Sequence, residues 1–149
     1  MRLTALYDRL TPIDVVNGID ARLIEAENQL KNNDVTGWLA TLNGLRTGAN
    51  RVTSIGTVTL AAMPALTDPG TPAARISLLF REKAFWTFAR GQRLGDLRRL
   101  VRQYGRASTD VFPEGVHFKA GNFGADVNLP VVTDEENNPN FTGCLDRNA

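Results

Sequence analysis

The sequence predicts a mostly α-helical protein with an irregular C-terminal tail, and three observations lead to this prediction. Two segments within residues 12–50 repeat apolar residues at helical spacing and are joined by a short polar link. Residues 72–106 indicate two further helices, which meet at Gly91. After Arg106 the helical period stops, and the chain becomes rich in turn-forming glycine, proline and asparagine.

Residues 12–50 predict an antiparallel αα-hairpin, because two amphipathic helices follow each other with only a short link. The expected apolar faces are Ile19, Leu23, Ala26 and Leu30 in the first helix and Trp38, Leu42, Leu45 and Ala49 in the second. Glu25 and Glu27 are expected to face solvent. Asp34 or Thr36 is expected to cap the second helix, since both have side-chain oxygens that suit this position.

Residues 51–71 have no helical period and are rich in threonine, glycine and proline. The segment is expected to be a loop, with a short extended piece at residues 58–60. Such a loop is long for a compact domain.

Residues 72–106 predict a buried helix followed by an amphipathic one. Thr71 is a suitable N-cap, and Pro72 suits the first helical turn. The first helix is apolar nearly all round, which is typical of a buried helix. Gly91 offers the positive φ that commonly ends a helix. The second helix has a narrower apolar stripe, made of Leu94, Leu97, Val101 and Tyr104, and Gly105 closes it.

The polar residues of this segment form the pattern Glu82-Lys83, then Gly91-x-Arg93-x-x-Asp96-Leu97-x-Arg99. This pattern resembles the signature helix pair of the SusD/RagB family of outer-membrane nutrient-binding lipoproteins. Trp86 and Arg90 stand where the family usually has glutamate. Arg93 and Asp96 lie three residues apart on one helix face, where a local ion pair can form; an exposed one would contribute only about 0.3–0.5 kcal/mol.

The resemblance extends from about residue 19 to the end of the chain. Residues 21–50 resemble the tetratricopeptide-like hairpin of the family, and residues 129–140 resemble its C-terminal Leu-Pro motif, with Val132 in place of a second proline. It implies that residues 1–149 are a single α-helical domain and the C-terminal fragment of a longer SusD-like chain. Its parts are a helical hairpin (12–50), the signature helix pair (72–106) and an irregular tail (107–149).

The resemblance also implies a function, which is the capture of an oligosaccharide or peptide at the cell surface. Such proteins sit on the outer membrane, anchored through a lipidated N-terminus that is absent from this chain. They deliver the nutrient to a TonB-dependent, SusC-like transporter without catalysis, cofactor or metal. The alternative is a free-standing helical module in the cytoplasm that binds a protein partner through the groove of its hairpin.

Composition favours a soluble globular domain, with 42% apolar and 22% charged residues. The net charge of +1 does not indicate a polyanionic partner. Cys144 is the only cysteine, so no internal disulfide can form, and its role stays open. No signal peptide or lipobox cysteine is visible at the N-terminus.

No catalytic, metal-binding or ligand-contacting residue can be assigned from the sequence. His117 is the only histidine, and no zinc-ligand spacing surrounds it, so a hydrogen-bonded or surface loop residue is expected. Arg98, Arg102 and Arg106 fall on one helical ridge. They suit either a nucleic-acid-binding face or a solvated helix surface, and the second is preferred because the domain is not basic overall.

Four aromatic residues of the central helix suit either a sugar-stacking platform or the hydrophobic core. They are Phe80, Phe85, Trp86 and Phe88. Their helical spacing on a helix expected to be buried favours the core.

Overall fold

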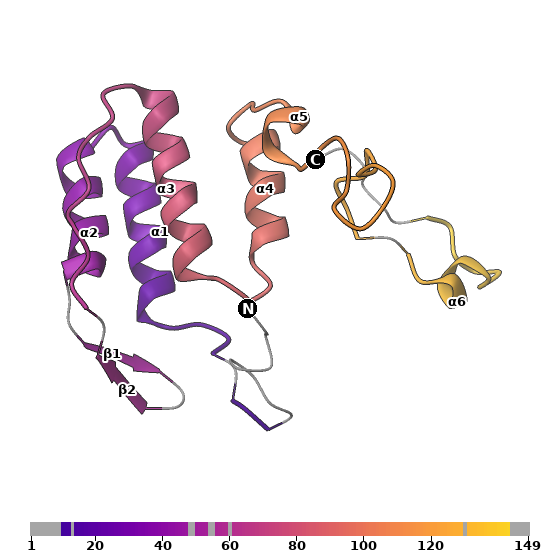
Figure 1. Ribbon diagram of the computed structural model, residues 1–149, viewed down its shortest axis with the longest axis horizontal. Helices are drawn as coiled ribbons and strands as arrows, with labels where there is room; N and C mark the ends of the chain where they lie inside the picture. Colours follow the sequence, from indigo (N-terminus) through magenta and orange to yellow (C-terminus); the bar gives the residue numbers. More distant parts are fainter. Residues whose placement is uncertain are drawn as a thin grey trace. The chain divides into compact units, whose positions relative to one another are not determined.

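The computed structural model describes residues 10–12, 14–47, 50–53, 56–59, 61–129 and 131–143. Within these ranges the elements follow the order α1 (Gly18–Lys31), α2 (Val35–Thr47), β1 (Asn50–Thr53), β2 (Gly56–Thr59), α3 (Pro72–Trp86), α4 (Arg93–Arg102), α5 (Ser108–Val111) and α6 (Thr133–Glu136) (Figure 1). The predicted mostly α-helical class is confirmed. The chain divides into two compact units, Met1–Arg90 and Gly91–Ala149, so the boundary falls within the helix pair predicted for residues 72–106.

Helices α1 and α2 form the predicted hairpin, and each begins with a side-chain cap. At the start of α1 the Asn17 side chain accepts from the backbone N–H groups of Ile19 and Asp20, at 3.0 and 3.3 Å. The Asp20 carboxylate in turn accepts from the Asn17 N–H at 2.8 Å, which completes a capping box. Asp34 caps α2 by accepting from the Gly37 N–H at 2.8 Å.

The core of the first unit lies between α1, α2 and α3. Its buried apolar side chains are Leu23 and Ala26 of α1, Trp38, Leu42 and Leu45 of α2, and Leu78, Leu79 and Phe80 of α3. The two predicted hairpin faces are therefore confirmed at these positions, while Ile19 and Leu30 are half-buried. Ala49, Leu60 and Cys144 lie outside the described residues.

The long loop expected at residues 51–71 instead begins with strand pairing. β1 and β2 pair antiparallel, with Asn50 opposite Thr59 and Thr53 opposite Gly56. β-branched threonine and valine dominate both strands and favour extended backbone. Residues 61–69, called the strap below, then run beside α2 towards the start of α3 (Figure 1).

Helix α3 begins as predicted, because the Thr71 side chain accepts from the Ala74 N–H at 3.2 Å and Pro72 is the first helical residue. It ends at Trp86, earlier than expected. The Thr87 hydroxyl and N–H both donate to the Lys83 carbonyl, at 2.7 and 2.9 Å. The following turn contains Ala89 at φ 60° and Gly91 at φ 76°.

The expectation that this helix is buried all round is wrong. Phe85 is 70% exposed and Phe88 in the following turn is 56% exposed, whereas Glu82 and Lys83 are only 2% and 6% exposed. Charged residues occupy the buried face because the α1–α2 hairpin supplies partners for them, as described below. The core interpretation of the aromatic residues holds for Phe80, which is buried, and fails for Phe85 and Phe88.

The second unit contains one longer helix and a mainly irregular tail, as predicted. The apolar stripe of α4 is half-buried at Leu94, Leu97, Val101 and Tyr104. Gly105, at φ 65°, ends the helix. The tail adds the one-turn helices α5 and α6 and an isolated bridge between Val116 and Asn122.

Replacing Gly91 by valine is expected to destabilise the protein, because a β-branched residue is strained at a φ of 76°. A side chain at this position would meet no atom within 4 Å, so the expected loss of about 1–3 kcal/mol is backbone strain rather than a clash. Chemical denaturation measures it. Gly95→Ala in α4 is the control and should be neutral or stabilising, since Gly95 has space and helical backbone. An unchanged free energy of unfolding in Gly91→Val would contradict the prediction.

Candidate functional site

The motif residues of α3 face the hairpin, and the first of them forms a buried ion pair. Glu82 receives both of its hydrogen bonds from Arg46 of α2, with Nη1 at 3.1 Å from Oε1 and 3.0 Å from Oε2. The Glu82 side chain is 2% exposed and that of Arg46 is 17% exposed. Arg46 also donates from Nε to the Pro64 carbonyl of the strap at 2.8 Å. One guanidinium therefore joins α2, α3 and the strap.

The second motif residue, Lys83, is buried beside Glu27 of α1. Its Nζ lies 3.6 Å from Glu27 Oε2, and the two side chains are 8% and 7% exposed. The same ammonium lies 5.2 Å from the centre of the Phe80 ring, a cation–π contact. The prediction that Glu27 faces solvent is wrong, because Lys83 offsets the cost of removing its carboxylate from water.

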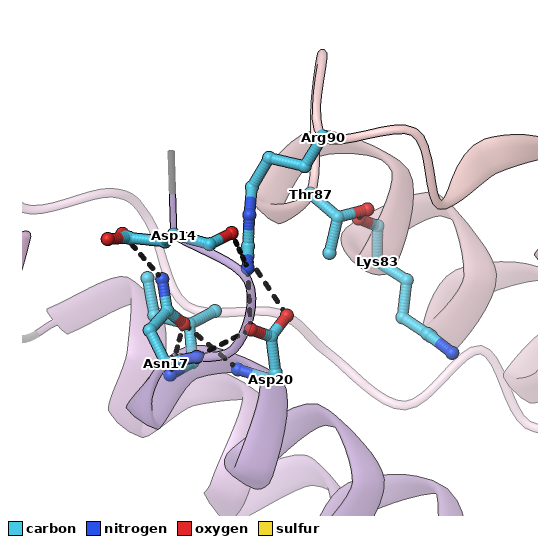
Figure 2. Close-up of polar contacts among 7 residues, drawn as sticks. Asp14, Asn17, Asp20, Lys83, Thr87 and Arg90 are labelled. Carbon is cyan, nitrogen blue, oxygen red and sulfur yellow. Dashed lines mark hydrogen bonds and ion pairs between the residues drawn. The ribbon is translucent and has the colours of Figure 1, made fainter. Parts of the chain in front are cut away.

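A third ion pair joins the N-terminus of α1 to the turn after α3 (Figure 2). Arg90 binds Asp20 through both terminal guanidinium nitrogens, with Nη1 at 3.0 Å from Oδ1 and Nη2 at 2.7 Å from Oδ2. Nη2 also donates to the Asp14 carbonyl at 3.2 Å, and the Asn17 side chain donates to the Asp14 carboxylate at 3.2 Å. Asp20 is thus the acidic partner of Arg90.

These three pairs hold elements of the first unit together. Each buried charge lies against an opposite charge from another element. Removing one partner of such a pair costs about 3–5 kcal/mol, because the other charge then remains buried without compensation. Among the residues that the structure describes, no three histidine, cysteine, aspartate or glutamate side chains gather as a metal site.

The predicted charged residues of α4 have structural contacts in the second unit. Asp96 is 5% exposed, and its Oδ1 lies 3.4 Å from Nη1 of Arg99, which is one turn further along the helix than Asp96. Arg98 donates to the carbonyl of the buried Val127 at 3.2 Å. Of the three predicted ridge arginines, Arg98 therefore helps to hold the tail on α4.

His117 is a hydrogen-bonded loop residue, as predicted. Its N–H donates to the Gly121 carbonyl at 2.8 Å, and its Nδ1 accepts from the Lys119 N–H at 3.3 Å. The imidazole ring lies 4.5 Å from the Phe118 ring and 5.0 Å from the Phe123 ring, between centroids. These contacts order the loop around the Val116–Asn122 bridge.

A surface groove lies in the first unit between the strap and α3. Its volume is about 540 Å³. The strap contributes Ala65, Leu66, Thr67 and Pro69, and α3 contributes Ala74, Ser77, Leu78 and Arg81. A groove of this size is within the range of small-ligand sites, about 300–1,000 Å³, so it is the candidate binding site of this unit.

Two polar clamps hold the strap in place. The Asn43 side chain of α2 accepts from the Leu66 N–H at 2.7 Å and donates to the Leu66 carbonyl at 3.2 Å. Near the start of α3, Arg75 binds Asp68 through Nε and Nη2, both at 2.7 Å. The hydrogen bonds from Arg75 and from the Gly70 N–H lower the pKa of Asp68 from its ordinary value of 3.8 to about 2.

Comparisons with protein-family models, with curated proteins and with solved structures found no match to this chain. Within the described ranges, no helix has the length and apolar character that crossing a bilayer requires.

Sequence reasoning located Glu82, Lys83 and Arg90 but not their partners. Asp20 had a local signal, since Asn17-x-x-Asp20 before an apolar run is the spacing of a capping box. Arg46, Glu27 and Asn43 have none, because their roles depend on segments that are distant in the sequence. The groove was also missed, since its strap wall lies within the segment expected to be a loop.

The Asp68–Arg75 clamp is expected to persist in mild acid. Because the folded pKa of Asp68 is lowered, its contribution to stability is fully present above about pH 3.8 and is lost as pH falls through about 2. Carboxyl-carbon NMR should give an Asp68 titration midpoint near 2. In Arg75→Gln the midpoint should rise towards 3.8. A midpoint near 3.8 in the unmodified protein would show that the clamp does not form in solution.

Proposed function

We propose that this chain is part of a SusD/RagB-like solute-binding protein of the outer membrane. It would capture an oligosaccharide or peptide and deliver it to a TonB-dependent transporter. The observation that carries the proposal is the placement of the motif residues. Glu82 and Lys83, two of the residues that carry the resemblance, are buried and dock α3 on the hairpin through Arg46 and Glu27.

This placement gives the motif a physical reason. A glutamate followed by a basic residue on the buried face of a helix lowers the stability of the fold unless the facing helices place opposite charges beside both side chains. Such a pattern defines a scaffold, in which one helix can dock on a hairpin in only one register. A scaffold with this role suits a protein that binds solutes, because a rigid surface loses little conformational freedom when a ligand binds.

The departures from the family pattern are consistent with the same role. Arg90 reverses the charge of an expected glutamate, and its bidentate contact with Asp20 restores a buried pair at that place. Trp86 is half-buried, so an apolar ring occupies the other position. Trp86 and Arg90 are therefore both partly buried, although neither is a glutamate.

The test is to locate the product of the gene that encodes this chain in its native host. A C-terminal epitope tag is added at the chromosomal locus, the cell envelope is fractionated, and tagged complexes are purified from mild detergent. The proposal predicts an outer-membrane location, sensitivity to protease added to intact cells, and co-purification of a large β-barrel transporter. Tagged cytoplasmic and periplasmic proteins serve as fractionation controls. Recovery in the cytoplasmic fraction would contradict it and favour the helical interaction module.

A further inference from the structure

The groove between the strap and α3 has two walls of different chemistry. On the α3 wall the lining residues lie at positions i, i+3, i+4 and i+7, which is one helix face about 10 Å long. The apolar residues of this face are Ala74 and Leu78, and Arg81 lies at its C-terminal end. The opposite wall is the main chain and the short side chains of the strap.

The strap presents unpaired main-chain groups. Asn43 binds both the N–H and the C=O of Leu66 on the side that faces α2. In the part of the chain that the structure describes, the main-chain groups of Ala65 and Thr67 make no hydrogen bond, and both residues are exposed. Exposed main-chain groups of this kind can pair with an added strand.

The charge of the groove favours an anionic group at one end. Among the described residues that line it, Arg81 is the charged one, and its side chain is 58% exposed. Its ion-pair contact is with Glu82 Oε1 at 3.8 Å, a carboxylate that already accepts two shorter hydrogen bonds from Arg46. The Arg81 guanidinium can therefore take a second carboxylate without breaking a strong pair.

We propose that this groove binds an extended peptide of about three residues, a length set by the ~10 Å wall and ~3.3 Å per residue. Its main chain pairs with Ala65 and Thr67, its small apolar side chains contact Ala74 and Leu78, and its C-terminal carboxylate binds Arg81. The inference rests on the proposed solute-binding function and names peptide as the ligand class. The eight described residues that line the groove include no aromatic ring on which a sugar face would stack, which disfavours an oligosaccharide here.

The experiment is an NMR titration of the ¹⁵N-labelled chain with mixed-sequence tripeptides of small apolar residues. One set has a free C-terminal carboxylate and the other has a C-terminal amide. The free-acid set should shift the amide signals of Ala65, Thr67 and Arg81 and should bind about 3- to 10-fold more tightly than the amide set. Arg81→Gln should remove this preference. Arg22→Gln, which changes an exposed arginine of α1 paired with Glu25, is the matched control and should keep it.

Three outcomes would each overturn the inference. They are equal affinity for the free-acid and amide peptides, an Arg81→Gln variant that still prefers the free acid, and unchanged amide signals of Ala65 and Thr67 on peptide addition. Shifts of these signals with maltohexaose alone would overturn it in favour of a sugar site. Circular dichroism of Arg81→Gln checks that the variant folds, as expected for an exposed side chain. The envelope location is measured separately, so an outer-membrane protein whose groove ignores peptides would refute this inference and leave the proposed function intact.

Discussion

The first unit depends on the pairing of charges that α3 buries against the hairpin. Glu82 and Lys83 lie side by side in the sequence with opposite charges, and each meets an opposite charge, from α2 and from α1 respectively. Apolar side chains such as Leu79 tolerate small shifts of a helix, whereas a buried carboxylate displaced from its guanidinium costs several kcal/mol. The apolar core therefore supplies most of the cohesion, and we infer that the ion pairs select the register in which α3 docks.

The same pairing connects the scaffold to the groove. Arg46 binds Glu82 through its terminal nitrogen and the Pro64 carbonyl of the strap through Nε. One turn earlier in α2, Asn43 holds Leu66. Arg46 thus links the position of the strap, and with it one wall of the groove, to the anchoring of α3. In the proposed solute-binding role, this coupling keeps the groove formed before a ligand arrives, so that little ordering remains to oppose binding.

Local and periodic signals predicted much of this fold. The spacing of Trp38, Leu42 and Leu45 located the hairpin core, and Thr71 with Pro72 located the start of α3. The burial of Glu27 could not be predicted from the sequence. A glutamate is expected to face solvent unless a basic side chain such as Lys83 is known to lie beside it. Phe85 was predicted to lie in the core but is exposed. Hydrophobicity indicates that a side chain can be buried, but it does not show that another surface covers it. The groove needs two segments whose proximity no local pattern encodes.

A double-mutant cycle on Arg46 and Glu82 tests the central claim most directly. Arg46→Met, Glu82→Met and the double variant are compared by chemical denaturation, with the exposed Arg22–Glu25 pair as the matched control cycle. The account predicts a loss of about 3–5 kcal/mol for Glu82→Met and a double variant at least about 2 kcal/mol more stable than additivity allows. The control pair should couple by no more than about 0.5 kcal/mol. Additive losses at Arg46 and Glu82 would contradict the claim that this pair determines how α3 docks.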